Sequence, residues 1–148
     1  YEIMPSLVGS EMCIRDRFMR VFEEEITVSK NDLDELNHVN NVIYIHWVQE
    51  IAKNHWKSLV SKEIINNYYW VLLEHHIKYI NPALLDDKIR LKTYIEKTEG
   101  LKSSRVVEIY NVHNNKLLVN SKTLWCLINA TTNKPCRITS EIRNARDQ

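Results

Sequence analysis

The sequence predicts an α+β fold in which one long helix covers one face of an antiparallel sheet. One strand pattern comes first, a single helical pattern follows over residues 41–60, and four more strand patterns complete the chain. The later strands are joined by connections of hairpin length, which makes them antiparallel. A chain of 148 residues suits one domain that buries its own core.

Composition excludes several classes of function. The net charge of +1 creates no field that would attract nucleic acid or an acidic membrane. With only 2 glycines, the chain has neither a P-loop nor a dinucleotide-binding fingerprint. The 3 cysteines are widely spaced, so they fit neither a disulfide framework nor a paired-cysteine zinc site. This cysteine usage favours a reducing, cytoplasmic compartment, and no apolar run has the length of a transmembrane helix.

The first 18 residues are expected to stand apart from the domain. They form a poor secretory signal, because Glu11 interrupts the apolar stretch and charged residues occupy 15–17. The run over residues 9–17 resembles the translated sequencing-adaptor sequence found in some metagenomic assemblies. We therefore expect residues 1–18 to be non-native or disordered, and a single domain over residues 19–148.

The first half of the domain reads as strand, loop and helix. Apolar and polar residues alternate over 21–30, which predicts a strand. The following NDLDELNHVN, residues 31–40, is rich in Asp and Asn and predicts a loop. Asn40 or Asn41 can cap the helix that follows. Apolar residues then recur at helical spacing to about residue 60, so much of this helix should be buried.

The second half predicts strands and no further helix. The strand patterns cover residues 69–79, 88–96, 103–112 and 117–128. In the first of them, alternation places five residues on one face: Tyr69, Val71, Leu73, Ile77 and Tyr79. In the last, alternation makes Leu118 and Val119 point to opposite faces.

The densest group of reactive side chains lies between the first strand and the helix. Seven of the ten residues 31–40 are Asp, Glu, Asn or His. A helix N-terminus presents free N–H groups and a partial positive charge, which can polarise a carbonyl. A carboxylate beside it could attack that carbonyl or activate a water molecule. The same residues would equally suit a simple capping turn, so the residue pattern alone leaves both interpretations open.

Residues 32–44, DLDELNHVNNVIY, resemble the signature of hotdog-fold thioesterases. The run is similar to that of the 4-hydroxybenzoyl-CoA thioesterase-like acyl-CoA thioesterases. Its residues Asp-Leu-Asp followed by His-Val-Asn-Asn also resemble the motif of the acyl-ACP thioesterases. The order of elements agrees over residues 20–138. The resemblance implies a hotdog fold and hydrolysis of an acyl thioester, on CoA or ACP, to a carboxylate and a thiol. It implies no cofactor and no metal.

The resemblance also implies catalytic roles. Asp34 matches the catalytic aspartate, as nucleophile or general base, and the backbone N–H near Asn41 matches the group that polarises the thioester carbonyl. His38 matches the histidine of the acyl-ACP motif. That motif carries an asparagine two residues after its aspartate, where this chain has Leu36, so its mechanism does not transfer directly. Asn37 replaces a glycine of the 4-hydroxybenzoyl type, and asparagine tolerates left-handed backbone.

Substrate contacts are expected at two places. Asn40 and Tyr44 belong to the motif itself. Lys102, Ser103 and Ser104 open a strand, where 4-hydroxybenzoyl-like enzymes carry a basic-Ser stretch that contacts CoA phosphates; a charged strand end is the competing interpretation.

Other candidates are weaker. His75 and His76 are adjacent on a strand and point to opposite faces, so they cannot share a metal. Glu50 lies on the polar stripe of the helix, where a solvated face is the default, and Cys126 belongs to an apolar face.

Two other functions compete with the thioesterase. A hotdog dehydratase usually carries a histidine followed by glycines, whereas His38 is followed by Val39 and Asn40. A non-catalytic acyl-CoA-binding module could keep the acyl tunnel and lose the carboxylate, whereas Asp34 is present.

Assembly follows from the strand patterns. The last strand carries apolar residues on both faces, yet one helix covers only one face, so a monomer would expose a large apolar patch. The sequence therefore predicts a two-fold homodimer, or a tetramer built from it. The resemblance implies that the acyl site lies between subunits.

Removal of residues 1–18 should change neither stability nor activity, because the segment shows no packing pattern. Thermal melting and thioester hydrolysis of the shortened and full chains check this. A melting temperature several degrees lower after truncation would show that the segment is structural.

Overall fold

The structure is a computed structural model and describes residues 21–147. The elements in chain order are β1 (Phe22–Thr27), the 3-10 turn η1 (Lys30–Asp32), α2 (Asn41–Leu59), α3 (Lys62–Asn67), β2 (Tyr68–Tyr79), β3 (Lys88–Glu99), β4 (Lys102–Asn111), β5 (Leu117–Asn129), β6 (Lys134–Pro135) and α4 (Ser140–Asp147).

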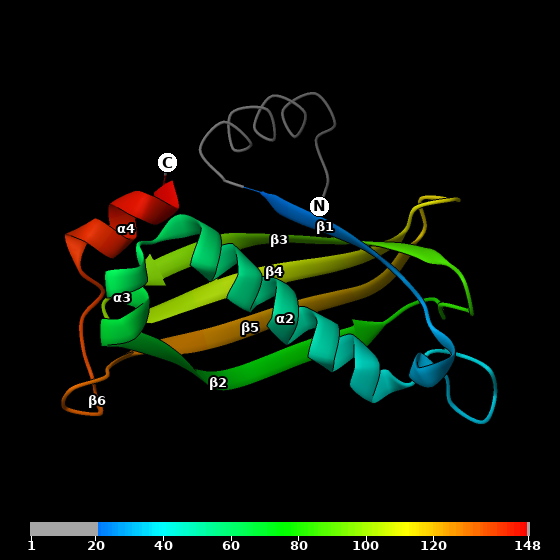
Figure 1. Cartoon of the computed structure of the whole chain (residues 1–148), viewed down its shortest axis with the longest axis horizontal. Helices are drawn as coiled ribbons and strands as arrows, with labels where there is room; N and C mark the ends of the chain where they lie inside the picture. Colours follow the sequence, from blue (N-terminus) through cyan, green and yellow to red (C-terminus); the bar gives the residue numbers. More distant parts are fainter. Residues whose placement is uncertain (1–20, 148) are drawn as a thin grey trace, which may run out of the picture.

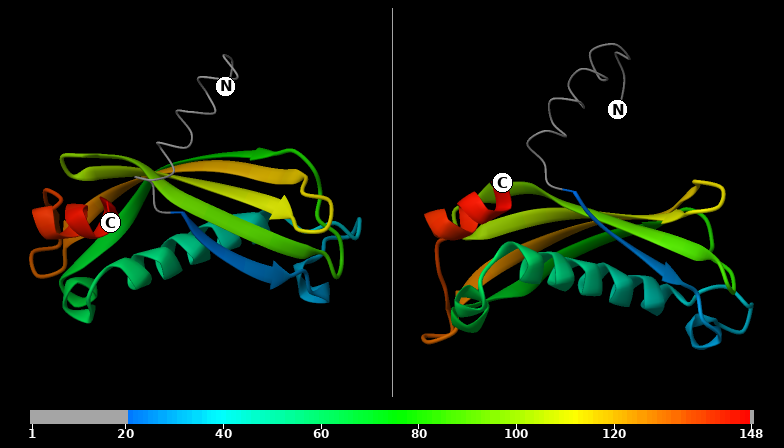
Figure 2. Two further views of the ribbon diagram at one scale, coloured as in Figure 1. Left: turned by 90° about the horizontal axis from the view of Figure 1, so that it is seen from above. Right: turned by 45° about the horizontal axis from the view of Figure 1, so that its top comes forward.

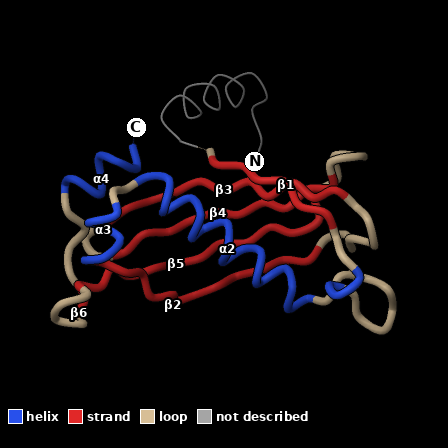
Figure 3. The backbone as a smooth tube through the Cα atoms, in the orientation of Figure 1, coloured by secondary structure: helices blue, strands red, loops and turns tan. Residues whose placement is uncertain are grey.

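One antiparallel sheet forms the body of the molecule. Its main strands lie in the order β1-β3-β4-β5-β2, and the two-residue β6 pairs with β5. The helix α2 crosses one face of this sheet (Figure 1), and the sheet curls around it (Figure 2). Figure 3 shows the same arrangement, with the strands as one layer behind the helix. The α+β fold class predicted from the sequence is confirmed.

The start and burial of α2 follow from its sequence. Asn40 has extended backbone and caps the helix, because its side chain accepts the N–H of Val42. The residues at helical spacing turn towards the sheet and are buried: Tyr44, Trp47, Val48, Ile51, Ala52 and His55. Only one stripe is apolar, so the opposite side of the helix stays in solvent.

Two short helices were not predicted. The helix α3 has 6 residues and buries only Ile64, so it offers no periodic pattern. Ser61 caps it by accepting the N–H of Ile64. The 8-residue α4 carries one large apolar residue, Ile142, which is fully buried. Among the side chains that the structure describes, one buried residue anchors each helix, and one residue cannot define a periodicity.

The predicted alternation placed Tyr69, Val71, Leu73 and Ile77 on one face of β2, and the structure contradicts this. A bulge between Leu72 and Glu74 adds one residue to β2 in its pairing with β5. Beyond the bulge Ile77 packs on the core, whereas before it Tyr69, Val71 and Leu73 are 41%, 40% and 46% exposed. A bulge reverses which residues face inward, so simple alternation fails there.

A second irregularity contradicts the faces predicted for β5. The pairing of β4 with β5 shifts between Ile109 and Tyr110. Leu118 and Val119, predicted to face opposite ways, are both buried in the same core cluster. The sheet therefore uses consecutive residues to fill the core at this end.

Inward-facing polar side chains separate two apolar core clusters. One cluster lies around Ile51 and Ile109, and the other lies around Ile64, Leu127 and Ile142. Between them along the strands lies a group that we call the polar belt: His55, His75, Thr93, Arg105, Ser121 and Thr123.

Hydrogen bonds join members of the polar belt. The Nη1 group of Arg105 donates to Nδ1 of His55 at 2.8 Å and to the hydroxyl of Thr93 at 3.0 Å. Arginine only donates, so Nδ1 of His55 is the acceptor. His75 Nε2 lies 2.7 Å from the Ser121 hydroxyl.

Stability should fall as the pH drops through the range in which His75 titrates. Burial, and then the neighbouring His76, lower the pKa of His75 below its ordinary 6.5. As the pH falls through this ordinary value, the unfolded chain takes up the proton first, so protonation favours unfolding. His75→Gln should therefore lose less unfolding free energy between pH 7.5 and pH 5.5 than the wild type, measured by urea unfolding.

His46→Gln is the control, because the His46 side chain is exposed on α2. Equal pH dependence in the His75→Gln variant and the wild type would contradict the assignment.

Candidate active site

The residues between β1 and α2 form two linked turns. In the first, the Oδ2 atom of Asp32 accepts the backbone N–H of Ser29 at 2.9 Å and its hydroxyl at 3.1 Å. The backbone carbonyl of Asp32 also accepts the N–H of Asn40 at 2.9 Å. Asp32 therefore ties the end of the first turn to the start of α2.

Asp34 closes the second turn with only one of its carboxylate oxygens. Its Oδ1 atom accepts the N–H groups of Leu36 at 2.9 Å and His38 at 3.1 Å. Asn37 has a φ of 61°, so the left-handed backbone that asparagine tolerates is present at this position. Among residues 21–147, no group donates a hydrogen bond to Oδ2. One carboxylate oxygen is thus available for chemistry.

The start of α2 presents a backbone donor in the same region. Asn40 uses its side-chain oxygen to accept the N–H of Val42 at 3.1 Å, which confirms it as the cap. The N–H of Asn41, one residue earlier, donates to no group in the described part of the chain. First-turn N–H groups lie at the positive end of the helix dipole, so this group can polarise a carbonyl oxygen.

Tyr44 supports this region from inside the fold. Its side chain is 2% exposed, and its hydroxyl accepts the N–H of Ala83 at 2.9 Å. Burial raises the pKa of Tyr44, the bond from Ala83 opposes that rise, and the charges of Asp87, Tyr79 and Asp34 add to it. The Asp34 carboxylate thus acts electrostatically on this buried hydroxyl. Tyr44 therefore supports the start of α2 from inside the fold, and its expected contact with substrate stays a prediction.

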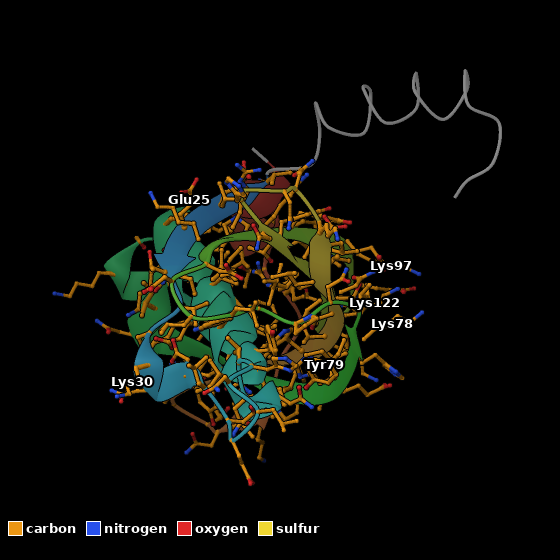
Figure 4. All side chains as sticks on the ribbon, turned by 90° about the vertical axis from the view of Figure 1, so that its right-hand side faces the viewer. Glu25, Lys30, Lys78, Tyr79, Lys97 and Lys122 are labelled. Atoms are coloured by element: carbon orange, nitrogen blue, oxygen red, sulfur yellow. The ribbon has the colours of Figure 1, made fainter. Side chains whose placement is uncertain are left out.

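The segment after β2 completes the support. The N–H of Val39 donates to the carbonyl of Ala83 at 3.0 Å, and His38 forms a β-bridge with Leu84. The Tyr79 hydroxyl donates to the carbonyl of Asn41 at 3.3 Å. Figure 4 looks onto this end of the molecule, where Lys78 points outward and Tyr79 lies towards α2.

Large apolar side chains are exposed around this region, among polar ones such as Glu35 and Asn37. Leu36, Val42 and Leu84 are 75%, 66% and 47% exposed. The His38 side chain is exposed as well and makes no hydrogen bond with residues 21–147. An apolar rim around a carboxylate and a helix N-terminus suits an acyl thioester better than a charged substrate.

Lys102, Ser103 and Ser104 do not join this region within one chain. They begin β4 at the end of the sheet where Ser103 pairs with Trp125, whereas the Asp34 turn lies at the opposite end (Figure 1). Ser103 is 5% exposed, so its hydroxyl is not a surface group.

A cavity of about 480 Å³ lies between the second half of α2 and this distant end of the sheet. We call it the aromatic cavity, because its lining includes Trp56, Tyr68, Trp70 and Trp125, together with Ser103 and Arg105. Sequence reasoning missed it, because its walls come from several elements. The available signal was a charged residue, Arg105, at an inward position of an apolar strand.

Glu50 and Cys126, the weaker candidates from the sequence, lie in different surroundings. Glu50 is exposed on α2, as expected, but it also lines the aromatic cavity. Cys126 is buried, in agreement with its predicted place in the core. Residues 21–147 contain no cluster of His, Cys, Asp or Glu suited to a metal ion. No helix in that range has the length and apolarity needed to cross a bilayer.

Solved structures share this architecture. A probable thioesterase, YbaW, from Escherichia coli is 20% identical with a TM-score of 0.76, covering 85% of this chain and 98% of that one. A 1,4-dihydroxy-2-naphthoyl-CoA thioesterase from Synechocystis is 19% identical with a TM-score of 0.75, covering 85% and 95%. The 12:0-ACP thioesterase from Umbellularia californica is 17% identical with a TM-score of 0.73, covering 84% of this chain and 49% of that one. This chain therefore spans about half of the Umbellularia californica protein, and the shared fold is the hotdog fold that the motif predicted.

Sequence comparison places the chain in a family. The model of the acyl-ACP thioesterase N-terminal domain matches residues 19–145. The chain belongs to this family, which confirms the predicted hotdog-fold thioesterase. No curated protein matches the sequence.

Tyr44→Phe should destabilise the fold by about 1–3 kcal/mol, because the buried N–H of Ala83 would lose its acceptor. Urea unfolding measures the difference. Tyr110→Phe is the control, because the Tyr110 hydroxyl bonds to the partly solvated Glu108 and its loss should cost at most about 0.5 kcal/mol. Equal losses of unfolding free energy in the two variants would contradict the structural role of Tyr44.

Proposed function

We propose that this protein hydrolyses an acyl-CoA thioester to a free carboxylate and CoA, with Asp34 as the catalytic carboxylate. The observation that carries the proposal is the available Oδ2 of Asp34. The turn of Asp34 lies between Asp32 and Asn40, and the carbonyl of Asp32 accepts the N–H of Asn40 at the start of α2. The family match supports thioester chemistry, and the apolar rim supports an acyl substrate.

Two routes use the same groups. As a nucleophile, Oδ2 forms a bond with the thioester carbon, the C–S bond breaks, and water then hydrolyses the resulting anhydride. As a general base, the carboxylate takes a proton from a water molecule whose oxygen attacks the same carbon, and the thiolate leaves and is protonated. In both routes the Asn41 N–H stabilises the negative charge that develops on the carbonyl oxygen.

His38 and Asn40 take different parts in this proposal. The exposed imidazole of His38 is the second candidate for proton transfer, beside the thioester. Asn40 acts through its cap, which fixes the direction of the Asn41 N–H. Leu36 supplies no amide two residues after Asp34, so we assign the reaction to the aspartate and not to a histidine–asparagine pair.

The carrier is the finer part of the proposal. The named CoA thioesterase from Synechocystis and the ACP thioesterase from Umbellularia californica show that this fold serves both carriers. We favour CoA, because the exposed Lys102 and the partly exposed Ser104 at the start of β4 offer contacts to its phosphates, whereas the Ser103 hydroxyl between them is buried. The same chemistry on ACP is the alternative.

We further propose a homodimer that pairs β2 with β2, from which a tetramer could be built. β2 is an edge strand of the sheet, so its outer N–H and C=O groups can pair with another chain. Tyr69, Val71 and Leu73 add an exposed apolar surface. Antiparallel pairing about a two-fold axis sets the Tyr68 end of one β2 beside the Tyr79 end of the other. The aromatic cavity of one subunit then lies near the Asp34 turn of its partner.

Asp34→Asn should keep the fold and lower kcat by about 10³-fold, because the amide can neither attack nor take a proton. Release of CoA thiol from a panel of acyl-CoA thioesters measures it. Asp32→Asn is the matched control, since Asp32 closes its own turn with Ser29, and it should lose far less activity. Turnover at the wild-type rate in Asp34→Asn would transfer the role to Glu50 or His38.

Val71→Lys should split the dimer and abolish activity, because a charge on the edge strand opposes pairing. Light scattering and thiol release measure the two effects. Val21→Lys, an equally exposed position before β1 at the other edge, is the control and should stay dimeric. A stable, fully active monomer of the wild type would refute the shared site.

A further inference from the structure

Tyr79, the last residue of β2, contacts the first turn of α2 in two ways. Its hydroxyl donates to the backbone carbonyl of Asn41 at 3.3 Å. Its ring lies beside the ring of Tyr44, with centroids 5.7 Å apart and planes at 57°. In Figure 4 the Tyr79 side chain lies towards α2. One side chain thus joins the end of an edge strand to the residue whose N–H is the proposed donor to the thioester carbonyl.

The sheet fixes the position of Tyr79 from the other side. Tyr79 pairs with Val119 of β5. The next two N–H groups, of Ile80 and Asn81, both donate to the carbonyl of Leu118, at 2.8 Å and 3.1 Å. These bonds tie the end of β2 to β5, so the Tyr79 hydroxyl meets the helix from a fixed place in the sheet.

The fold does not depend on the Tyr79 hydroxyl. The Tyr79 side chain is 41% exposed, whereas Tyr44 is 2% exposed. A carbonyl in the first turn of a helix already accepts the N–H four residues later, so the Asn41 carbonyl has a partner without Tyr79. Burial raises the pKa of Tyr79 above its ordinary 10.0, so the hydroxyl keeps its proton and remains a donor at neutral pH. A donor that folding can spare is suited to a role in function.

The first turn is the part of a helix where an extra bond changes orientation most. Its N–H groups have no acceptor within the helix, so its peptide groups are held by fewer bonds than those further along. Before Asn41, the N–H of Asn40 donates to the carbonyl of Asp32 at 2.9 Å. After the Asn41 N–H, Tyr79 holds the carbonyl of the same residue. The direction of the Asn41 N–H is therefore set from both sides.

We propose that Tyr79 is a positioning residue of the thioesterase: by holding the Asn41 carbonyl, its hydroxyl aims the Asn41 N–H at the carbonyl oxygen of the thioester. This inference rests on the proposed hydrolysis and adds a residue from outside the motif to it. Negative charge on that oxygen is greatest in the transition state. Loss of alignment should therefore slow the reaction more than it weakens substrate binding.

Tyr79→Phe tests the proposal, because it keeps the ring and removes only the hydroxyl. We expect kcat for acyl-CoA hydrolysis, measured by thiol release, to fall by about tenfold, with KM within about twofold of the wild type. The midpoint of urea unfolding and the oligomeric state should not change. Tyr110→Phe is the matched control, because the Tyr110 hydroxyl bonds to Glu108 at the same 3.3 Å within β4. It should keep the wild-type kcat.

A bound carbonyl reports on the Asn41 N–H directly. The probe is a ketone analogue of an acyl-CoA, in which CH₂ replaces the thioester sulfur and the carbonyl carbon is ¹³C. Its carbonyl stretch is measured by infrared difference spectroscopy. We expect a higher frequency in Tyr79→Phe than in the wild type and Tyr110→Phe, because a weaker hydrogen bond leaves a stronger C=O bond. A merely structural role of Tyr79 would lower stability without moving this band.

The inference requires both the fall in kcat and the shift of the carbonyl band. Either result without the other overturns it, and so does a change confined to KM. A wild type that hydrolyses acyl-CoA no faster than Tyr79→Phe overturns the role of Tyr79 and leaves the thioesterase intact. A wild type that hydrolyses no acyl-CoA refutes the proposed function, and the role of Tyr79 with it.

Discussion

The hydrogen bond from the N–H of Ala83 to the buried hydroxyl of Tyr44 is the contact on which the candidate site depends. It fixes the first turn of α2 against the segment that follows β2. The same segment receives the N–H of Val39, and Asn40 is tied to the carbonyl of Asp32. These bonds hold the Asp34 turn and the Asn41 N–H in one arrangement. A displacement of about 1 Å between reacting groups can cost a hundredfold in rate, so this rigidity is what the proposed chemistry requires.

The polar belt is the second constraint. A core of this size could be filled by apolar side chains alone, yet here Arg105 and His55 are 7% and 2% exposed between two apolar clusters. Burial of a cation is costly unless hydrogen bonds compensate it, and Thr93 and His55 supply such bonds. Arg105 belongs both to the polar belt and to the lining of the aromatic cavity.

The sequence predicted those parts of the molecule that depend on local pattern. Helical spacing identified α2 with its cap, and the motif identified the turn in which Asn37 has left-handed backbone. Alternation failed at the bulges of β2 and β5, because one extra residue reverses the faces and leaves no trace in composition. It also missed α4, where Ile142 is the one buried residue among those whose side chains the structure describes. The aromatic cavity escaped prediction because helix and sheet supply its walls jointly.

The central claim is that the Asp34 turn and the N-terminus of α2 hold a thioester carbonyl between them. A crystal structure of the protein with a ketone analogue of an acyl-CoA, in which CH₂ replaces the thioester sulfur, tests it most directly. The account predicts the ketone oxygen within hydrogen-bond distance, about 3 Å, of the Asn41 N–H, with an Asp34 carboxylate oxygen facing the carbonyl carbon. A ketone bound with its oxygen away from the start of α2 and its carbon beyond reach of Asp34 would contradict the account.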